Sequence, residues 1–176
     1  MFKIFIDGQN GTTGLQIKDR LAERGDIELI ELLDAERKTD AAKRAALDAA
    51  DVAILCLPDD AARQTAALAK KTRLIDASTA HRTHPDWTYG LPELCPEQRR
   101  KIQTAQRVSN PGCYPTGFIL LVRPLIALGL LKPEQAIFVS ALSGYSGGGK
   151  AMIKDYQEQS QTACRPYGLT LKHKHL

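Results

Sequence analysis

Residues 2–14 read FKIFIDGQNGTTG, and this stretch decides the fold. Phe2 to Ile6 are mostly apolar and predict a short buried strand. The loop that follows has a G-x-x-G-x-x-G spacing, and Leu15 to Arg24 then show a helical pattern. A glycine triplet between a first strand and a first helix is typical of a dinucleotide-binding site.

The three glycines of this loop are Gly8, Gly11 and Gly14. Their spacing differs from the commoner G-x-G-x-x-G, but the physical requirements are the same. One glycine makes the turn, one lets a pyrophosphate approach the backbone, and one lets the helix pack on the strand. We therefore predict that the glycines, with Thr12 and Thr13 between them, bind a dinucleotide; a structural turn is the less favoured alternative.

Strands and helices are predicted to alternate after this loop, at Ile27–Leu33, Ala41–Ala50, Val52–Leu57, Ala61–Lys70 and Arg73–Asp76. Asp59 and Asp60 stand where the N-cap of a helix belongs. Strands that alternate with helices indicate βαβ units and a parallel sheet. The predicted fold class is therefore α/β, with a doubly wound parallel sheet.

Residues beyond the second strand bear on the choice of nucleotide, because the adenosine ribose binds there in such folds. Asp34 lies twenty residues after Gly14 and is suited to a ribose 2′-hydroxyl, which favours NAD. Arg37 and Lys38 are suited to a 2′-phosphate, which favours NADP. Charge alone leaves both nucleotides open.

A second distinctive loop spans residues 109–117, SNPGCYPTG, between a predicted strand at Ala105–Val108 and a predicted buried helix over Phe118–Leu131. Its Pro-Gly pair predicts a tight turn, because proline fixes φ and Gly112 tolerates a positive φ. Cys113 then lies at or just before the first helical turn, where free N–H groups and the helix dipole favour a thiolate. On these local grounds a nucleophile and a buried, inert cysteine are equal alternatives.

The segment DASTAHR, residues 76–82, leaves the fourth strand at its carboxyl end, where ligands of open α/β sheets bind. Ser78, Thr79 and Arg82 are therefore predicted to face a ligand, although an ordinary polar loop is an equal alternative on local grounds. Residues 84–96, which hold three prolines and the only tryptophan, predict an ordered loop over the sheet edge.

Residues 143–150, SGYSGGGK, follow a further predicted strand at Ala136–Leu142 and precede a predicted helix over Ala151–Gln161. Their spacing excludes a P-loop NTPase. A loop of glycine and serine near a helix start can still hold an anion through its backbone N–H groups.

The composition fits a soluble globular protein of 176 residues with 43% hydrophobic and 25% charged residues. The net charge is +4 and the basic residues are scattered, so no nucleic-acid surface is predicted. No apolar run has membrane-spanning length and no signal peptide is recognised, so a cytoplasmic location is expected. The four cysteines lack metal-site spacing, and two histidines near the end lack further ligands, so no metal is predicted.

Four motifs together resemble one family, the shorter, second type of N-acetyl-γ-glutamyl-phosphate reductase, over essentially the whole chain. They are GQNGTTG at 8–14, YGLPE at 89–93, SNPGCYPT at 109–116 and SGYSGGG at 143–149. Residues 76–82 are similar to that family's segment after its fourth strand. The resemblance implies a Rossmann-type NADP domain over residues 1–112, followed by an incomplete α+β catalytic domain over residues 113–176.

This resemblance also implies a reaction of arginine biosynthesis, in which NADPH reduces N-acetyl-γ-glutamyl phosphate to N-acetylglutamate γ-semialdehyde through a thioester. Cys113 matches the family's nucleophile, and His175 is assigned as the acid and base. The cofactor-binding residues are expected to be Gly8, Gly11, Thr12, Thr13, Gly14, Arg37, Lys38, Ser78, Gly147 and Gly148. The substrate-binding residues are expected to be Arg82, Asn110, Ser143 and Gly144.

In members of the family, the chain continues well beyond the segment that corresponds to His173–Leu176. This chain is therefore expected to be an N-terminal part, and the missing elements are expected to leave apolar surface exposed. A homo-oligomer is expected for the full-length form. Three alternatives remain: an aspartate-semialdehyde dehydrogenase-like enzyme, a nucleotide-binding fragment without catalysis, and a cysteine hydrolase without a cofactor.

Overall fold

The structure is a computed structural model, and it describes residues 1–9 and 11–158. The chain forms two units, Met1–Ala141 and Leu142–Leu176. The first unit contains the sheet and the loops at its carboxyl edge. The second unit is described on its own below, and the predicted domain boundary after residue 112 stays a prediction.

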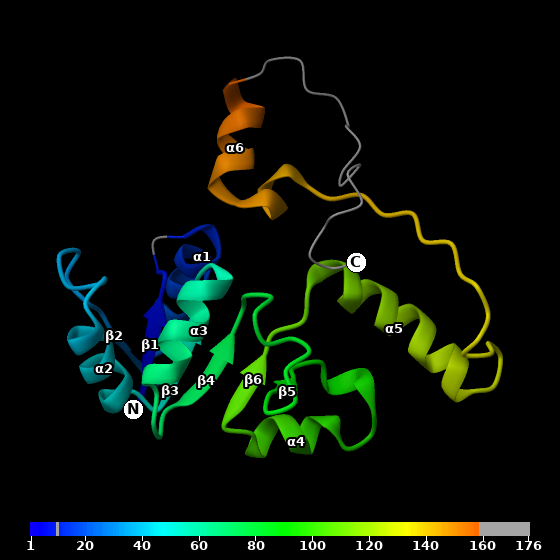
Figure 1. Cartoon of the computed structure of the whole chain (residues 1–176), viewed down its shortest axis with the longest axis horizontal. Helices are drawn as coiled ribbons and strands as arrows, with labels where there is room; N and C mark the ends of the chain where they lie inside the picture. Colours follow the sequence, from blue (N-terminus) through cyan, green and yellow to red (C-terminus); the bar gives the residue numbers. More distant parts are fainter. Residues whose placement is uncertain (10, 159–176) are drawn as a thin grey trace. The chain divides into compact units, whose positions relative to one another are not determined.

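The first unit is built on a six-stranded sheet in the order β2-β1-β3-β4-β6-β5, and every pair of neighbouring strands is parallel (Figure 1). The strands are β1 (Phe2–Asp7), β2 (Ile27–Ile30), β3 (Val52–Leu55), β4 (Arg73–Asp76), β5 (Thr88–Tyr89) and β6 (Arg107–Ser109). The predicted parallel α/β sheet is confirmed. The sequence did not predict β5, because it is only two residues long and lies inside the proline-rich segment.

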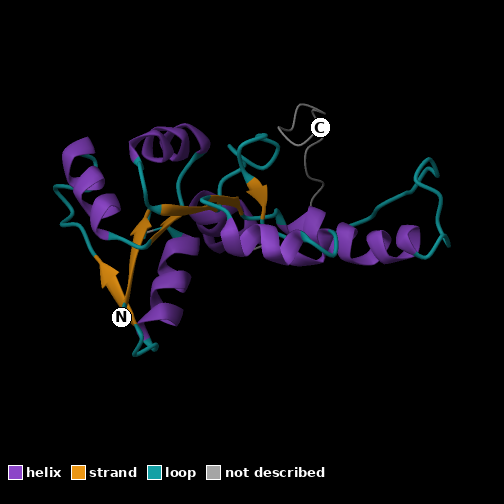
Figure 2. Ribbon diagram, turned by 90° about the horizontal axis from the view of Figure 1, so that it is seen from below, coloured by secondary structure: helices purple, strands orange, loops and turns teal. Residues whose placement is uncertain are grey.

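The helices of this unit are α1 (Thr12–Ala22), α2 (Asp40–Ala49), α3 (Asp59–Leu68), α4 (Gln98–Thr104) and α5 (Cys113–Ala127). A short 3₁₀ helix, η1 (Pro92–Leu94), precedes α4. Helices lie on both faces of the sheet (Figure 2). Since βαβ connections are right-handed and the strand order reverses at β1, α1 covers one face and the pair α2–α3 covers the other.

The core lies between the sheet and the two alanine-rich helices α2 and α3. Leu47, Leu55 and Leu74 are completely or almost completely buried. Alanines of α2 and α3, together with Ala53 of β3, pack in the same cluster, and their small side chains let the helices approach the sheet closely. Trp87 extends this core from the loop before β5.

The N-cap prediction for α3 is wrong. Pro58 is the N-cap residue, and Asp59 and Asp60 are the first two helical residues. The carboxylate of Asp59 instead accepts hydrogen bonds from the backbone N–H and the hydroxyl of Thr79, at 3.1 and 2.5 Å. The Asp59 carboxylate therefore binds Thr79 in the loop after β4 and does not cap the first turn of α3.

The strand predicted at Ala136–Leu142 is also wrong. These residues are extended but pair with no strand among the described residues, and the exposed fraction of Phe138 reaches 92%. A strand needs a hydrogen-bonded neighbour, so an apolar alternating pattern alone does not form one.

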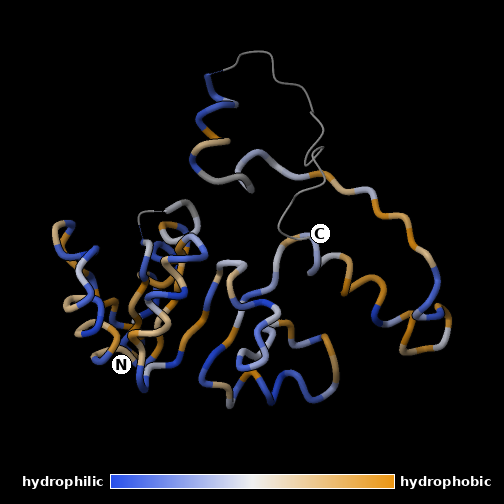
Figure 3. The backbone as a smooth tube through the Cα atoms, viewed as in Figure 1, coloured by the Kyte–Doolittle hydropathy of each residue, from blue (hydrophilic) through white to orange (hydrophobic). Residues whose placement is uncertain are grey.

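Helix α5 is strongly apolar, as its colour in Figure 3 shows, yet every residue of it is at least partly exposed. Leu121 and Leu128 are 74% and 72% exposed. The prediction of a buried helix over Phe118–Leu131 is therefore wrong, because no residue of α5 is buried. The apolar surface that was expected to be exposed in an N-terminal part is present on this helix. A hydrogen bond from Arg123 Nε to the carbonyl oxygen of Leu94, at 3.0 Å, connects the helix to η1.

The described part of the second unit contains η2 (Tyr145–Gly148) and α6 (Gly149–Glu158). The rings of Tyr145 and Tyr156 stack at 5.3 Å and connect these two elements. The predicted helix after residue 150 is thus confirmed up to Glu158, and its last three predicted residues lie outside the described residues.

Candidate functional site

Four strands of the sheet end in a single row. Asp7 of β1 pairs with Leu55 of β3, Leu55 pairs with Asp76 of β4, and Asp76 pairs with Ser109 of β6. The loops that follow these strands carry the glycine triplet, the DASTAHR segment and the Cys113 motif. Parallel strands bring their carboxyl ends to one edge, so three segments far apart in the sequence meet there.

Two of the three glycines of the first loop are required by close backbone contacts. Gly8 has φ +88°, and a Cβ at this position would lie 2.2 Å from the carbonyl oxygen of Cys56. A Cβ on Gly14 would lie 2.3 Å from the carbonyl oxygen of Gly8. Gly8 therefore makes the turn against β3, and Gly14 lets α1 pack onto that turn.

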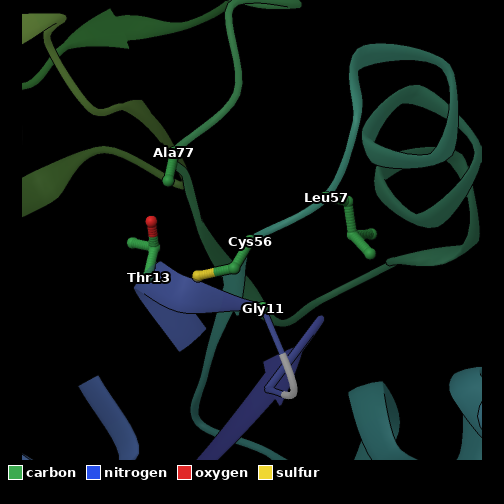
Figure 4. A pocket seen from close by; sticks show the side chains of 5 residues that line it. All are labelled: Gly11, Thr13, Cys56, Leu57 and Ala77. Atoms are coloured by element: carbon green, nitrogen blue, oxygen red, sulfur yellow. The ribbon is translucent and has the colours of Figure 1, made fainter. Parts of the chain in front are cut away.

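The third glycine, Gly11, is the N-cap of α1 and lines a pocket of about 210 Å³ (Figure 4). The other lining residues are Thr13, Cys56, Leu57 and Ala77. No side chain among the described residues caps α1, so the backbone N–H groups of its first turn are available to an anion. Thr12 begins α1, and its side chain is outside what the structure describes.

A buried ion pair stabilises the end of β1, next to the turn at Gly8. The carboxylate of Asp7, just before Gly8, accepts hydrogen bonds from Thr65 Oγ1 at 2.8 Å and from Lys43 Nζ at 2.9 Å. Both partners come from helices on one face, Lys43 from α2 and Thr65 from α3. The end of β1 is thereby fastened to the helices that cover it.

Cys113 is exposed and is the first residue of α5. Its predicted position at the helix start is confirmed. The N-cap residue is Gly112, and no side chain of the described residues caps this helix. The N–H groups of Cys113 and Tyr114 are therefore available to a negative charge, whereas Pro115 has no N–H and that of Thr116 donates to the carbonyl oxygen of Gly112.

The expected reason for Gly112 is wrong, because its φ is −73°, a value that any residue adopts. Its lack of a side chain leaves space for a neighbouring side chain instead. A Cβ at this position would lie 2.7 Å from Nη1 of Arg82. Gly112, the residue before Cys113, thus leaves space for the guanidinium of Arg82.

Arg82 donates hydrogen bonds to the backbone of the loop that contains Cys113, residues 109–117, here called the Cys113 loop, and to the backbone after β4. Its Nε donates to the carbonyl oxygen of Asn110 at 3.1 Å, and its Nη2 donates to that of Ala77 at 3.3 Å. The N–H of Asn110 donates in turn to the carbonyl oxygen of Asp76 at 2.7 Å. The structure therefore brings Arg82, Asn110 and Cys113 together at one edge of the sheet.

Comparison with protein families decides the relationship. The model of the semialdehyde dehydrogenase NAD-binding domain matches residues 3–102, more than half of the chain, and that of the semialdehyde dehydrogenase dimerisation domain matches residues 113–176. The chain belongs to the semialdehyde dehydrogenase family. The glycine loop and its pocket thus lie in the part that matches the NAD-binding model.

Curated relatives from this family are named N-acetyl-γ-glutamyl-phosphate reductase. Those from Mesorhizobium japonicum and a Chelativorans species are 54% and 53% identical over 99% of this chain. One from Brucella anthropi is 53% identical, also over 99% of this chain. The chain spans 57–58% of the length of these relatives.

Solved structures of semialdehyde dehydrogenases share the fold. Aspartate semialdehyde dehydrogenase II from Vibrio cholerae, complexed with ASA, gives a TM-score of 0.63 at 16% identity. The match covers 91% of this chain and 52% of that one. The enzyme from Francisella tularensis gives 0.63 at 18% identity and covers 88% and 48%. At this level of identity, the likeness concerns the fold.

Other predicted site residues of this semialdehyde dehydrogenase chain have defined contacts. Ser78 is buried, and its hydroxyl donates to Asp76 Oδ2 at 2.7 Å. Arg37 forms an ion pair with Asp34, so the two groups that favoured different nucleotides bind each other. Lys38 is exposed beside them.

The remaining predicted residues belong to the second unit or lie beyond the described residues. Ser143 Oγ donates to the carbonyl oxygen of Gly144 at 3.3 Å, and the N–H of Gly147 donates to the same carbonyl at 2.9 Å. With Gly148 in η2, they form one turn before α6. His175 lies outside the described residues.

Among the helices that the structure describes, none combines the length and the apolar character of a membrane-spanning segment.

Sequence reasoning missed Cys56, which lines the pocket beside the glycine loop. Its sulfur points toward the side of the pocket where Thr13 lies (Figure 4). Burial raises the pKa of the Cys56 thiol to about 11, and the negative charges of Asp76 and Asp7 act in the same direction. The sequence signal was available, since Cys56 is the last residue but one of the strand predicted at Val52–Leu57, close to the ligand-binding edge.

Cys56 is therefore expected to react slowly with iodoacetamide. At pH 8 a thiol with a pKa of about 11 has about a hundredfold less thiolate than one with the ordinary value of 9.0. The alkylation rate at Cys56, followed by peptide mass spectrometry, should rise about tenfold per pH unit from pH 8 to pH 10. A plateau below pH 9, measured beside N-acetylcysteine as a reference thiol, would contradict the raised pKa.

Proposed function

We propose that this chain carries the nucleotide site and the nucleophile of an NADP-dependent N-acetyl-γ-glutamyl-phosphate reductase. The observation that carries the proposal is the position of Cys113, exposed at the start of α5 and at the same sheet edge as the glycine loop. The names of the relatives at 52–54% identity favour this substrate over aspartyl phosphate.

The residues around the pocket fit a dinucleotide. Gly11 leaves space above the uncapped N-terminus of α1, where a pyrophosphate would accept backbone N–H groups. We assign Arg37 and Lys38 to the 2′-phosphate of NADP, which would take the place of the Asp34 carboxylate on Arg37. NADPH, when bound, supplies the hydride for the reduction.

Cys113 carries the covalent step. Its thiolate sulfur attacks the γ-carbonyl carbon of the acyl phosphate, the carbon–oxygen bond to phosphate breaks, and a thioester and inorganic phosphate result. After reduction to a hemithioacetal, the carbon–sulfur bond breaks, the aldehyde leaves, and the thiolate is restored. We assign the stabilisation of the oxyanion to the N–H groups at the start of α5 and to the side chain of Asn110.

The other groups follow from this scheme. Arg82 is the proposed contact for the substrate phosphate, with Ser143 and Gly144 as further substrate contacts and Ser78, Gly147 and Gly148 near the cofactor. His175 is proposed as the acid and base that moves the proton at the hemithioacetal oxygen. A homo-oligomer is proposed because residues 113–176 match a dimerisation domain, and the cytoplasm is the proposed location.

Phosphate-dependent reduction of NADP by N-acetylglutamate γ-semialdehyde, the reverse reaction, tests the proposal. Turnover should require phosphate, should favour this aldehyde over aspartate β-semialdehyde, and should favour NADP over NAD. Preference for aspartate β-semialdehyde would support the aspartate-semialdehyde dehydrogenase alternative. NADP binding without turnover of either aldehyde would support a nucleotide-binding fragment, and absence of NADP binding would revive the cysteine hydrolase.

A further inference from the structure

We propose that the buried pair Asp76–His81 is a positioning device that holds the guanidinium of Arg82 against the Cys113 loop. The inference rests on the proposed function, because a cation beside Cys113 matters for catalysis when the nucleophile reacts with an anionic acyl phosphate. Neither Asp76 nor His81 was among the residues that the sequence predicted to contact a ligand. Both are positioning residues that act through Arg82.

The carboxylate of Asp76 binds two residues of the loop that follows β4, Ser78 and His81. The group is completely buried, and its Oδ1 accepts the backbone N–H of Ser78 at 2.9 Å. Its Oδ2 accepts the hydroxyl of Ser78 at 2.7 Å and lies 2.6 Å from Nδ1 of His81. Since a carboxylate only accepts hydrogen bonds, the Nδ1 of His81 is the donor in this contact.

The imidazole of His81 makes a stacking contact in addition to its hydrogen bond with Asp76. Its ring stacks on Trp87, with 4.0 Å between the ring centroids and 10° between the planes. Trp87 belongs to the hydrophobic core, and both side chains are almost fully buried. The stack fixes the plane of the imidazole, and the hydrogen bond to Asp76 fixes its rotation within that plane.

Arg82 directly follows this fixed histidine. Its Nε and Nη2 bind the carbonyl oxygens of Asn110 and Ala77, and its Nη1 lies 2.7 Å from the position that a Cβ of Gly112 would take. The backbone of Asp76 also accepts the N–H of Asn110. Asp76 therefore connects to the Cys113 loop by two routes, through its backbone and through His81 and Arg82.

The electrostatic effect of Arg82 on Cys113 gives a readout that needs neither a cofactor nor turnover. Iodoacetate and iodoacetamide both alkylate the thiolate, so the ratio of their rate constants at Cys113 cancels the thiolate fraction and reports the local potential. In the whole 176-residue chain at low ionic strength, Arg82→Met should lower this ratio about fivefold. Peptide mass spectrometry separates Cys113 from the other cysteines.

Two amide variants of His81 form a matched pair. His81→Asn places an N–H near the position of Nδ1 and restores a donor to Asp76, whereas His81→Gln places it near the position of Nε2. Both lose the stack on Trp87. We expect His81→Asn to keep the ratio of the parent chain within about twofold, and His81→Gln to lower it as Arg82→Met does.

Equal ratios in the two amide variants would overturn the proposal, whether both are high or both are low. An unchanged ratio in Arg82→Met would overturn it as well. If either amide variant fails to fold by circular dichroism, His81→Phe decides, because it keeps a ring on Trp87 and removes the donor. A parental ratio in His81→Phe would show that His81 only packs, whatever the turnover assays find.

Discussion

Replacing Cys113 with serine is expected to lower phosphate-dependent reduction of NADP by at least about 10⁴-fold. A serine hydroxyl stays protonated near neutral pH. Among the described residues, the Cys113 loop (residues 109–117) contains no side chain that could act as a general base and activate the hydroxyl. Because Cys113 is exposed at the first turn of α5, the change should leave folding and NADP binding as they are. Turnover, NADP titration and thermal unfolding of the same preparation check all three.

Cys95→Ser is the matched control for this prediction. Cys95 is also a free cysteine, but it lies between η1 and α4, where its sulfur contacts Gln98 at 3.7 Å. This variant should keep turnover close to that of the parent chain. Mass spectrometry should find the acyl group on Cys113 in the parent chain. A Cys113→Ser variant with turnover within tenfold of the parent would refute the thioester mechanism.

Replacing Gly8 with alanine is expected to destabilise the first unit by on the order of 3 kcal/mol and to abolish NADP binding. The backbone of Gly8 has φ +88°, which L-residues rarely adopt, and the new Cβ would lie 2.2 Å from the carbonyl oxygen of Cys56. That oxygen belongs to the backbone after β3, so the turn must move away from the pocket. Denaturant unfolding and NADP titration measure the two effects.

Gly25→Ala controls for the loss of a glycine as such. A Cβ at Gly25 meets no atom within 4 Å, so the free energy of unfolding should change by no more than about 0.5 kcal/mol. Gly14→Ala separates the two causes, because its Cβ would lie 2.3 Å from Gly8 oxygen without a positive φ. An unfolding midpoint of Gly8→Ala equal to that of Gly25→Ala would show that the turn does not need glycine.

Local pattern was enough to predict much of the fold. The apolar run before Gly8 and the glycine spacing predicted β1, the turn and α1, because each depends on neighbours within a few residues. Alternating strands and helices predicted the parallel sheet. The Pro-Gly pair predicted that Cys113 lies at or just before the first turn of a helix, and the structure confirms this, although the helix begins five residues earlier than the predicted Phe118. The same reasoning failed at 136–142, where a strand would have required a partner elsewhere in the chain.

The contacts that make these pieces into a site have no local signal. The stack of His81 on Trp87, the support of Asp7 by Lys43, and the place of Arg82 beside Gly112 all join segments that the chain brings together only by folding. Residue type and spacing predicted which groups can react, because turn geometry and helix starts are short-range. Distances between those groups depend on strand order and packing, and so they are set when the sheet aligns the row from Asp7 to Ser109.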